Sequence, residues 1–316
     1  FYNLLKVEEY YELFLSLYKV GGRYRSRRIE EVLEMLEMTQ YKQTFIGELP
    51  IDTFPFLYLG KAILQEPEWL LMDGPFDNMS VTARKKMIGI IGAMEEEVQA
   101  LRHAMKIQEE KEIASMVFHR GILYGKEAVV VRSGIGKVNA AICTQILADH
   151  FDVDLVINTG IAGSLDAAID IGDMVISTDA VQHDMDTSIF GDPIGQVPRM
   201  DTFAFPADAQ LVEKAVRANQ EANPDIHTFT GRIASGDQFI SSQEVKERIV
   251  TLFGAKCAEM EGAAIAHGAY LNQIPCVIVR AISDKADNSA SMDYPAFEKK
   301  AIEHSIRLLE KLLPEL

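Results

Sequence analysis

Residues 88–103 read IGIIGAMEEEVQALRH, and this stretch decides which fold we expect the chain to adopt. The apolar run Ile88–Gly92 predicts a buried strand, and the apolar spacing after it predicts a helix over 95–103. The same strand–loop–helix order returns later. Strands are expected at 128–132, 154–158, 174–178, 232–235 and 275–281, and helices at 136–150, 208–219, 242–253, 262–271 and 294–313. Repeated units of this kind predict a mostly parallel sheet with helices on both faces.

The region before residue 87 has a different pattern. Residues 1–47 are expected to be helical, with apolar residues at helical spacing over 10–18 and 29–38. Another helix is expected over 56–64, and the run 69–72 predicts a short buried strand. The chain is therefore predicted to divide into a small, mainly helical segment over 1–86 and a larger domain over 87–316.

Composition narrows the class of partner. The chain has 316 residues and a formal net charge of −16, with 31 Lys and Arg against 47 Asp and Glu. This charge disfavours nucleic acid and anionic membranes as partners. Three widely spaced cysteines form no metal-binding pattern, and neither a signal segment nor a long apolar run is visible. We expect a cytoplasmic protein that does not insert into membranes.

Acidic residues follow several of the expected strands. They are Glu95 to Glu97, Asp237, Glu259, Glu261 and Asp284. Parallel sheets bind ligands beyond the carboxyl ends of their strands, so these side chains are candidates for one site. Three acids in a first helical turn also suit the helix dipole. A buried carboxylate in that turn is equally a candidate general base toward water, and a carboxylate cluster disfavours a phosphate site there.

Glycine and aromatic residues near these ends have two interpretations each. The loops at Gly134 and Gly136 and at Gly160 and Gly163 are either tight turns or cradles for a ligand. Phe239 packs in the core or stacks on a base. Glu259 and Glu261 cap a helix or bind paired ribose hydroxyls, and Asp284, at the end of an apolar strand, is a candidate proton donor. The run His183-Asp184-Met185-Asp186 has metal-ligand residue types, but a metal site there is disfavoured.

Six motifs occur together in a recognisable order. They are IGIIGAMEEEV, SGIGKVNAA, NTGIAGSL, SGDQFI, EMEG and VIVRAISDKAD. Residues 87–316 thereby resemble the 5′-methylthioadenosine/S-adenosylhomocysteine nucleosidases, which are nucleoside phosphorylase-like enzymes. The resemblance implies a three-layer α/β/α sandwich with a mixed, mostly parallel sheet, a homodimer, and hydrolysis of the N-glycosidic bond to adenine without metal or organic cofactor.

The resemblance also implies a role for individual residues. Glu97 matches the base that activates water, and Asp284 the acid that protonates adenine N7. Glu261 beside Met260 matches the ribose contact. Phe239 would stack on adenine and the Ile240 backbone would meet its Watson–Crick edge. The remaining implied contacts are to the ribose, the water and the alkylthio tail, by Met94, Ile135, Gly163 and Tyr294.

One residue departs from the family pattern. Ile161 stands where many members have Ser in the TG-x-AG turn, and we expect this difference to affect rate or substrate preference but not the reaction class. Hydrolysis of aminodeoxyfutalosine stays open, because it changes only the 5′ substituent. A phosphate-dependent phosphorylase is disfavoured by the acids at 95–97. The alternative that is not an enzyme is a nucleoside-sensing module linked to a transporter partner.

Residues 1–86 resemble a degenerate fragment of an ABC-transporter ATP-binding domain. The resemblance lies in RRIEEVLEMLEMTQY and LYLGKAILQEPEWLLMDGPFDNMS. The phosphate-binding loop is missing, and Gly74 follows Asp73 where a catalytic glutamate is usual. ATP hydrolysis is therefore not expected.

Overall fold

The computed structural model of the chain describes residues 2–18, 20–50, 53–67, 70, 86–287 and 290–316, without the side chains of Arg23 and 291–296. It forms two compact units, Phe1–Lys85 and Lys86–Leu316. Apart from Leu70, the strand expected at 69–72 falls outside the described residues, as do Asp73 and Gly74. Each unit is described by itself.

The first unit is helical. Its helices are α1 (Val7–Leu17), α2 (Gly22–Met35) and α3 (Phe54–Ile63). They enclose their own apolar core, in which Val7, Leu15 and Val32 are fully buried. The Tyr11 hydroxyl donates a hydrogen bond to the carbonyl of Leu57 (3.2 Å) and so joins α1 to α3.

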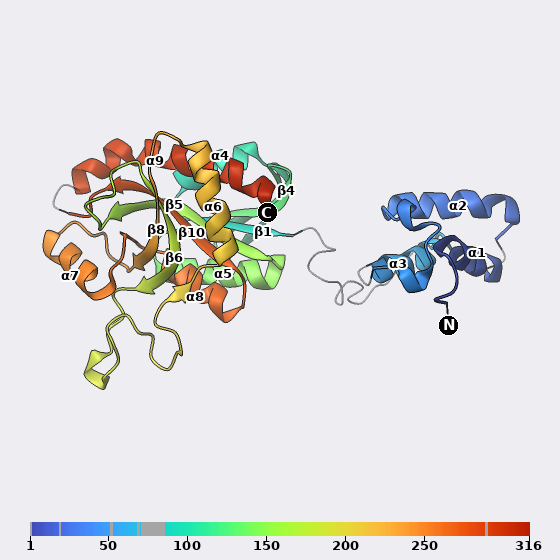
Figure 1. The fold of residues 1–316 in the computed structure, drawn as a ribbon, viewed down its shortest axis with the longest axis horizontal. Coiled ribbons are helices and arrows are strands. Elements are labelled where there is room, and N and C mark those ends of the chain that lie inside the picture. The colour runs from blue at the N-terminus through green and yellow to red at the C-terminus, as the bar shows by residue number, and fades with distance from the viewer. Residues whose placement is uncertain (1, 19, 51–52, 68–69, 71–85, 288–289) are drawn as a thin grey trace. The chain divides into compact units, whose positions relative to one another are not determined.

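The second unit is built on one mixed sheet (Figure 1). Its strands are β1 (Ile88–Gly92), β2 (Lys106–Ile113), β3 (Met116–Leu123), β4 (Lys126–Arg132), β5 (Leu155–Ser164), β6 (Met174–Gln182), β7 (Phe205–Pro206), β8 (Thr228–Ser235), β9 (Cys257–Glu259) and β10 (Cys276–Asp284). The strand order is β10-β6-β8-β9-β5-β1-β4-β3-β2, with β7 beside β6. Because β10 also pairs with β5, the strands β5, β10, β6, β8 and β9 form a closed ring.

Helices cover both faces of this sheet. They are α4 (Glu95–Ala104), α5 (Lys137–Phe151), α6 (Ala209–Ala222), α7 (Gln243–Phe253), α8 (Gly262–Leu271) and α9 (Ala290–Leu312). Helices α4, α6 and α9 share one apolar core with the sheet, and α5 and α8 share another. The expected α/β class, mixed sheet and three layers are confirmed. Within the part of the chain that the structure describes, no helix has both the length and the apolar character needed to span a membrane.

The sequence prediction was wrong about the segment that contains Gly160 and Gly163. We expected a strand that ends before Thr159, followed by a turn, but β5 runs to Ser164. The extension forms because β10 pairs with β5 in parallel from Cys276 onward, which supplies hydrogen bonds to the glycine-rich stretch. Neither glycine has a positive φ, so both are ordinary strand residues.

Candidate active site

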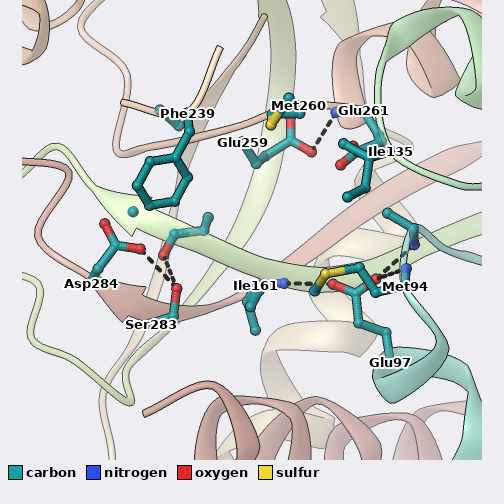
Figure 2. Close-up of a pocket in the computed structure, with 14 residues that line it drawn as sticks. Met94, Glu97, Ile135, Ile161, Phe239, Glu259, Met260, Glu261, Ser283 and Asp284 are labelled. Atoms are coloured by element: carbon teal, nitrogen blue, oxygen red, sulfur yellow. Dashed lines mark hydrogen bonds between the residues drawn. The ribbon is translucent and has the colours of Figure 1, made fainter. Parts of the chain in front are cut away.

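A cavity of about 230 Å³ opens at the carboxyl ends of β1, β5 and β10 and is also lined by the end of β9 (Figure 2). The structure brings together in its wall eight of the residues predicted for the site: Met94, Glu97, Ile135, Gly163, Phe239, Met260, Glu261 and Asp284. Ile240 is not among the lining residues, because its side chain is buried in the core near Ile249 and Phe253. Tyr294 lies in α9, but its side chain is outside the described residues.

Glu97 lies in the first turn of α4 and is buried. Its Oε2 accepts hydrogen bonds from the backbone N–H groups of Ala93 (2.6 Å) and Met94 (3.0 Å). Its Oε1 accepts one from the N–H of Ile161 (3.3 Å). Burial raises the pKa of Glu97, against the opposing effects of Arg280 and these N–H donors. A buried carboxylate with a raised pKa that faces a cavity is suited to accept a proton from water.

Asp284 ends β10 and is buried like Glu97. Its Oδ2 accepts a hydrogen bond from the Ser283 hydroxyl (2.9 Å), and its Oδ1 accepts one from the N–H of Ala286 (2.8 Å). The neighbouring strand leaves room for this carboxyl, since a Cβ on Gly163 would stand 2.6 Å from Asp284 Oδ1. Gly163 therefore leaves space for the Asp284 carboxyl because it has no side chain. The interpretation of this segment as a turn did not predict that role.

The two carboxyl groups lie on different sides of the cavity. Figure 2 shows Asp284 beside the ring of Phe239, and Glu97 beyond Ile161. Phe239 is half-exposed and lines the cavity, so the interpretation of it as a core residue is wrong. A planar base lying on Phe239 would be within reach of one acid, and a sugar in the rest of the cavity within reach of the other.

Beneath the cavity lies a buried charge network around Arg280. Its guanidinium donates hydrogen bonds to Glu259 and to the side chain of Asn158. Glu259 also accepts from the Ser235 hydroxyl and from the N–H groups of Glu261 (3.1 Å) and Gly262 (2.8 Å). Burial favours a raised pKa for Glu259, but Arg280 and Ser235 outweigh it and the pKa lies below its usual value. Glu259 is thus an ionised partner of Arg280 and also lines the cavity.

Glu261 has the opposite balance. It is buried, and its Oε1 accepts a hydrogen bond from the N–H of Gly136 (2.8 Å). Burial, and then the nearby negative charge of Glu259, raise the pKa of Glu261 to about 7. The pKa values of two neighbouring glutamates are therefore shifted in opposite directions, because Arg280 pairs with Glu259.

Arg280 was the member of the site that sequence reasoning missed. The available signal was a single arginine within the otherwise apolar strand Cys276–Asp284, because a buried arginine needs acidic partners. Its partners lie at 158 and 259, and that pairing is not visible without the fold. The sequence also gave no reason to expect Ser283 and Ala93 in the cavity wall. Among the described residues, His, Cys, Asp and Glu side chains form no group of three or more suited to a metal ion.

Comparison with known proteins agrees with this geometry. Residues 87–314 match the phosphorylase superfamily. The 5′-methylthioadenosine/S-adenosylhomocysteine nucleosidase of Staphylococcus aureus (strain MRSA252) is 44% identical over 231 residues, which are 73% of this chain and 100% of the relative. Two solved structures are also similar. The 5′-methylthioadenosine/S-adenosylhomocysteine nucleosidase of Colwellia psychrerythraea 34H in complex with adenine has a TM-score of 0.71 at 38% identity, covering 74% of this chain and 96% of that one. The futalosine hydrolase of Helicobacter pylori strain 26695 has a TM-score of 0.69 at 37% identity, covering 73% and 98%.

The family model matches more than half of the chain, and the Staphylococcus aureus relative is covered along its whole length. The similar region begins one residue after the start of the second unit, so the cavity and both buried acids lie within it. Through residues 87–314, this chain belongs to the phosphorylase superfamily.

Proposed function

We propose that the protein hydrolyses the N-glycosidic bond of 5′-methylthioadenosine and S-adenosylhomocysteine, releasing adenine and the thioribose. The observation that carries the proposal is the position of Glu97 and Asp284 in one cavity, with Phe239 beside Asp284. The Staphylococcus aureus relative, which bears this activity in its name, and the Colwellia structure with adenine support the choice of substrate.

The proposed reaction divides between the two acids. Asp284 donates a proton to N7 of the adenine, so that the base leaves as a neutral molecule when the bond between C1′ and N9 breaks. Glu97 accepts a proton from a water molecule whose oxygen bonds to C1′. The ionised carboxylate of Glu261 stabilises the positive charge that develops on the ribosyl group, whereas the charge of Glu259 is balanced by Arg280. This division of labour resembles that of the two carboxyl groups of O-glycosidases, although here the acid acts on a ring nitrogen.

The other residues predicted for the site bind the substrate in this proposal. Phe239 stacks on the base, and the Ile240 backbone meets its Watson–Crick edge. Glu261, beside Met260, accepts hydrogen bonds from the ribose hydroxyls. The contacts to the ribose, the water and the 5′ tail are assigned to Met94, Ile135, Gly163 and Tyr294.

The direct test is adenine release from methylthioadenosine in phosphate-free buffer. The wild type should release adenine together with methylthioribose, and added phosphate should not change the rate. Glu97→Gln and Asp284→Asn should each lower kcat by at least about a hundredfold while the protein stays folded, because each removes one proton transfer. Turnover that needs phosphate, or that is unchanged in either variant, would contradict the proposal.

A second candidate substrate is aminodeoxyfutalosine. The similarity to the futalosine hydrolase of Helicobacter pylori favours it, and only the 5′ substituent differs. Comparing kcat/KM for methylthioadenosine, adenosylhomocysteine and aminodeoxyfutalosine in one enzyme preparation decides between them.

We also propose a homodimer in the cytoplasm. Support for a dimer comes from Val138 and Ile142, two apolar side chains exposed on α5 next to the exposed Ile135. Support for a reducing compartment comes from Cys143, Cys257 and Cys276, which are free thiols. Light scattering during size-exclusion chromatography tests the first statement, and fractionation of cells that express the protein tests the second.

For residues 1–86 we propose a non-catalytic role. The unit has its own apolar core, and its sequence lacks a phosphate-binding loop. Its resemblance to an ABC-transporter ATP-binding domain stays a prediction, as does a transporter partner. ATP turnover by the full chain would contradict a non-catalytic role.

A further inference from the structure

A lysine and two aspartates that do not line the cavity connect three segments of the second unit. Lys137 Nζ donates a hydrogen bond to Asp184 Oδ1 (2.6 Å), and the Lys137 backbone N–H donates one to Asp237 Oδ1 (2.8 Å). The backbone N–H of Asp237 donates to Asp184 Oδ2 (2.9 Å), which closes a triangle of contacts. We call these three residues the Lys137 cluster.

Within the Lys137 cluster, the ion pair between Lys137 and Asp184 is largely shielded from water, whereas Asp237 is exposed. The side chains of Lys137 and Asp184 are each 18% exposed. Burial favours a raised pKa for Asp184, but the hydrogen bonds from Lys137 and the Asp237 backbone outweigh it and leave the pKa below its usual value. The ion pair is therefore formed at neutral pH, and a shielded ion pair constrains its neighbours more than an exposed one does.

Two of the three segments carry a residue that lines the cavity. Ile135 lies two residues before Lys137, and Phe239 lies two residues after Asp237. Each of these apolar side chains is about half exposed, and each belongs to a loop that the Lys137 cluster holds. The third segment, at Asp184, follows β6 and gives the other two a common attachment to the sheet.

The two loops approach each other closely at Gly136. Its φ of +97° is favourable for glycine, and a Cβ there would stand 3.2 Å from Asp237 Oδ1. The Gly136 N–H donates a hydrogen bond to Glu261, which lines the cavity. The Lys137 N–H donates one to Asp237, which does not line it. One short turn is thus fixed at the same time to the cavity wall and to the Phe239 loop.

We infer that Lys137, together with Asp184 and Asp237, positions Ile135 and Phe239 and so sets the gap into which the nucleoside enters, with Phe239 on the side of the adenine base. This inference rests on the proposed function. The acids that carry the chemistry depend on other contacts: Glu97 on the N–H groups of residues 93, 94 and 161, and Asp284 on Ser283 and Ala286. Loss of the Lys137 cluster should therefore weaken binding of the base far more than it slows bond cleavage.

The experiment compares Lys137→Met, Lys137→Arg and Asp184→Asn with the wild type. The matched control is Asp179→Asn, because Asp179 lies on the same strand, β6, and pairs with Arg232 (2.6 Å) away from the cavity. The measurements are kcat and KM for methylthioadenosine, the Kd of adenine by calorimetry, and Tm. In Lys137→Met and Asp184→Asn we expect KM and Kd to rise about tenfold or more while kcat stays within about threefold. Lys137→Arg should recover most of the affinity, and Asp179→Asn should change Tm without changing KM.

Two results would overturn the inference. One is a lowered Tm in Lys137→Met and Asp184→Asn with an unchanged KM and adenine Kd, which would show that the Lys137 cluster only stabilises the fold. The other is a loss of kcat at constant KM. If Lys137→Met does not fold, Asp184→Asn keeps a side chain of the same shape, removes the ion pair and gives the same readout. A wild type that neither binds adenine nor releases it would refute the proposed function, and this inference with it, before any variant is compared.

Discussion

Gly160 of β5 lies against the carboxylate of Glu97, so that a Cβ on Gly160 would stand 2.7 Å from Glu97 Oε1. The same oxygen accepts a hydrogen bond from the N–H of Ile161, the next residue in the strand. The absence of a side chain at 160 and the N–H at 161 thus define one place for the carboxylate. The glycine is needed for the position of the general base rather than for a turn.

Gly160→Ala should therefore impair catalysis more than folding. The methyl group would meet the carboxylate at the end of the Glu97 side chain and displace it, and a displaced base loses on the order of a hundredfold in kcat. Kinetic assays and thermal unfolding of the same preparation check this. The control is Gly89→Ala in β1, where the methyl group would meet Leu147 Cδ1 at 3.0 Å, away from the cavity. Equal kcat in the two variants would contradict the argument.

The pKa of about 7 for Glu261 predicts a pH dependence of substrate binding. Ribose hydroxyls donate hydrogen bonds, so they need the ionised carboxylate, and KM should fall as the pH rises through about 7. The effect on stability has the opposite direction. Because the pKa of Glu261 is raised from 4.5 in the folded protein, the free energy of unfolding should decrease as the pH rises from about 4.5 to about 7.

Glu261→Gln should remove both pH effects, since the amide does not titrate. The measurements are KM and urea unfolding at half-unit steps between pH 5 and 8.5 for the wild type and the variant. If the difference between the two proteins is the same at every pH, Glu261 is not the titrating group.

Arg280→Met should destabilise the second unit by about 3–5 kcal/mol at pH 8, because it leaves the buried Glu259 without a cation. The loss should be smaller at pH 5, where the carboxylates left behind can take up protons. Urea unfolding at the two pH values tests this. The double variant Arg280→Met with Glu259→Gln should recover part of the stability, whereas Arg232→Met, at a more exposed ion pair, should cost far less.

Removal of residues 1–85 should leave kcat/KM within about twofold of the full chain, because the cavity is built from residues of the second unit. Calorimetry should show the thermal transition of the second unit at an unchanged temperature and the loss of a separate transition for the first unit, since each has its own core. A large loss of activity would show that the first unit contributes to catalysis.

Much of the second unit could be predicted because its strands are apolar runs with glycine or an acid at the end. Ile88–Gly92 was predicted with its observed bounds, and eight of the ten predicted site residues line the cavity. The hairpin of β2 and β3 was not predicted, because KIQEEKEI of β2 is charged and exposed and shows no apolar alternation. The Arg280 network and the Lys137 cluster could not be predicted from the sequence either, since each joins residues that only the fold brings together.

The closed ring of strands and the charged strand β2 together limit how this protein can aggregate. Edge strands are the places where a second chain can add to a sheet. At one end of the sheet β10 returns to pair with β5, so the strands there close into a ring and little of their length is left as an open edge. At the other end β2 pairs only with β3 among the described strands, and its remaining edge carries Lys106, Glu109, Glu110, Lys111 and Glu112. A polar strand that looks unsuited to a sheet is thus suited to its border, where it discourages growth into fibrils.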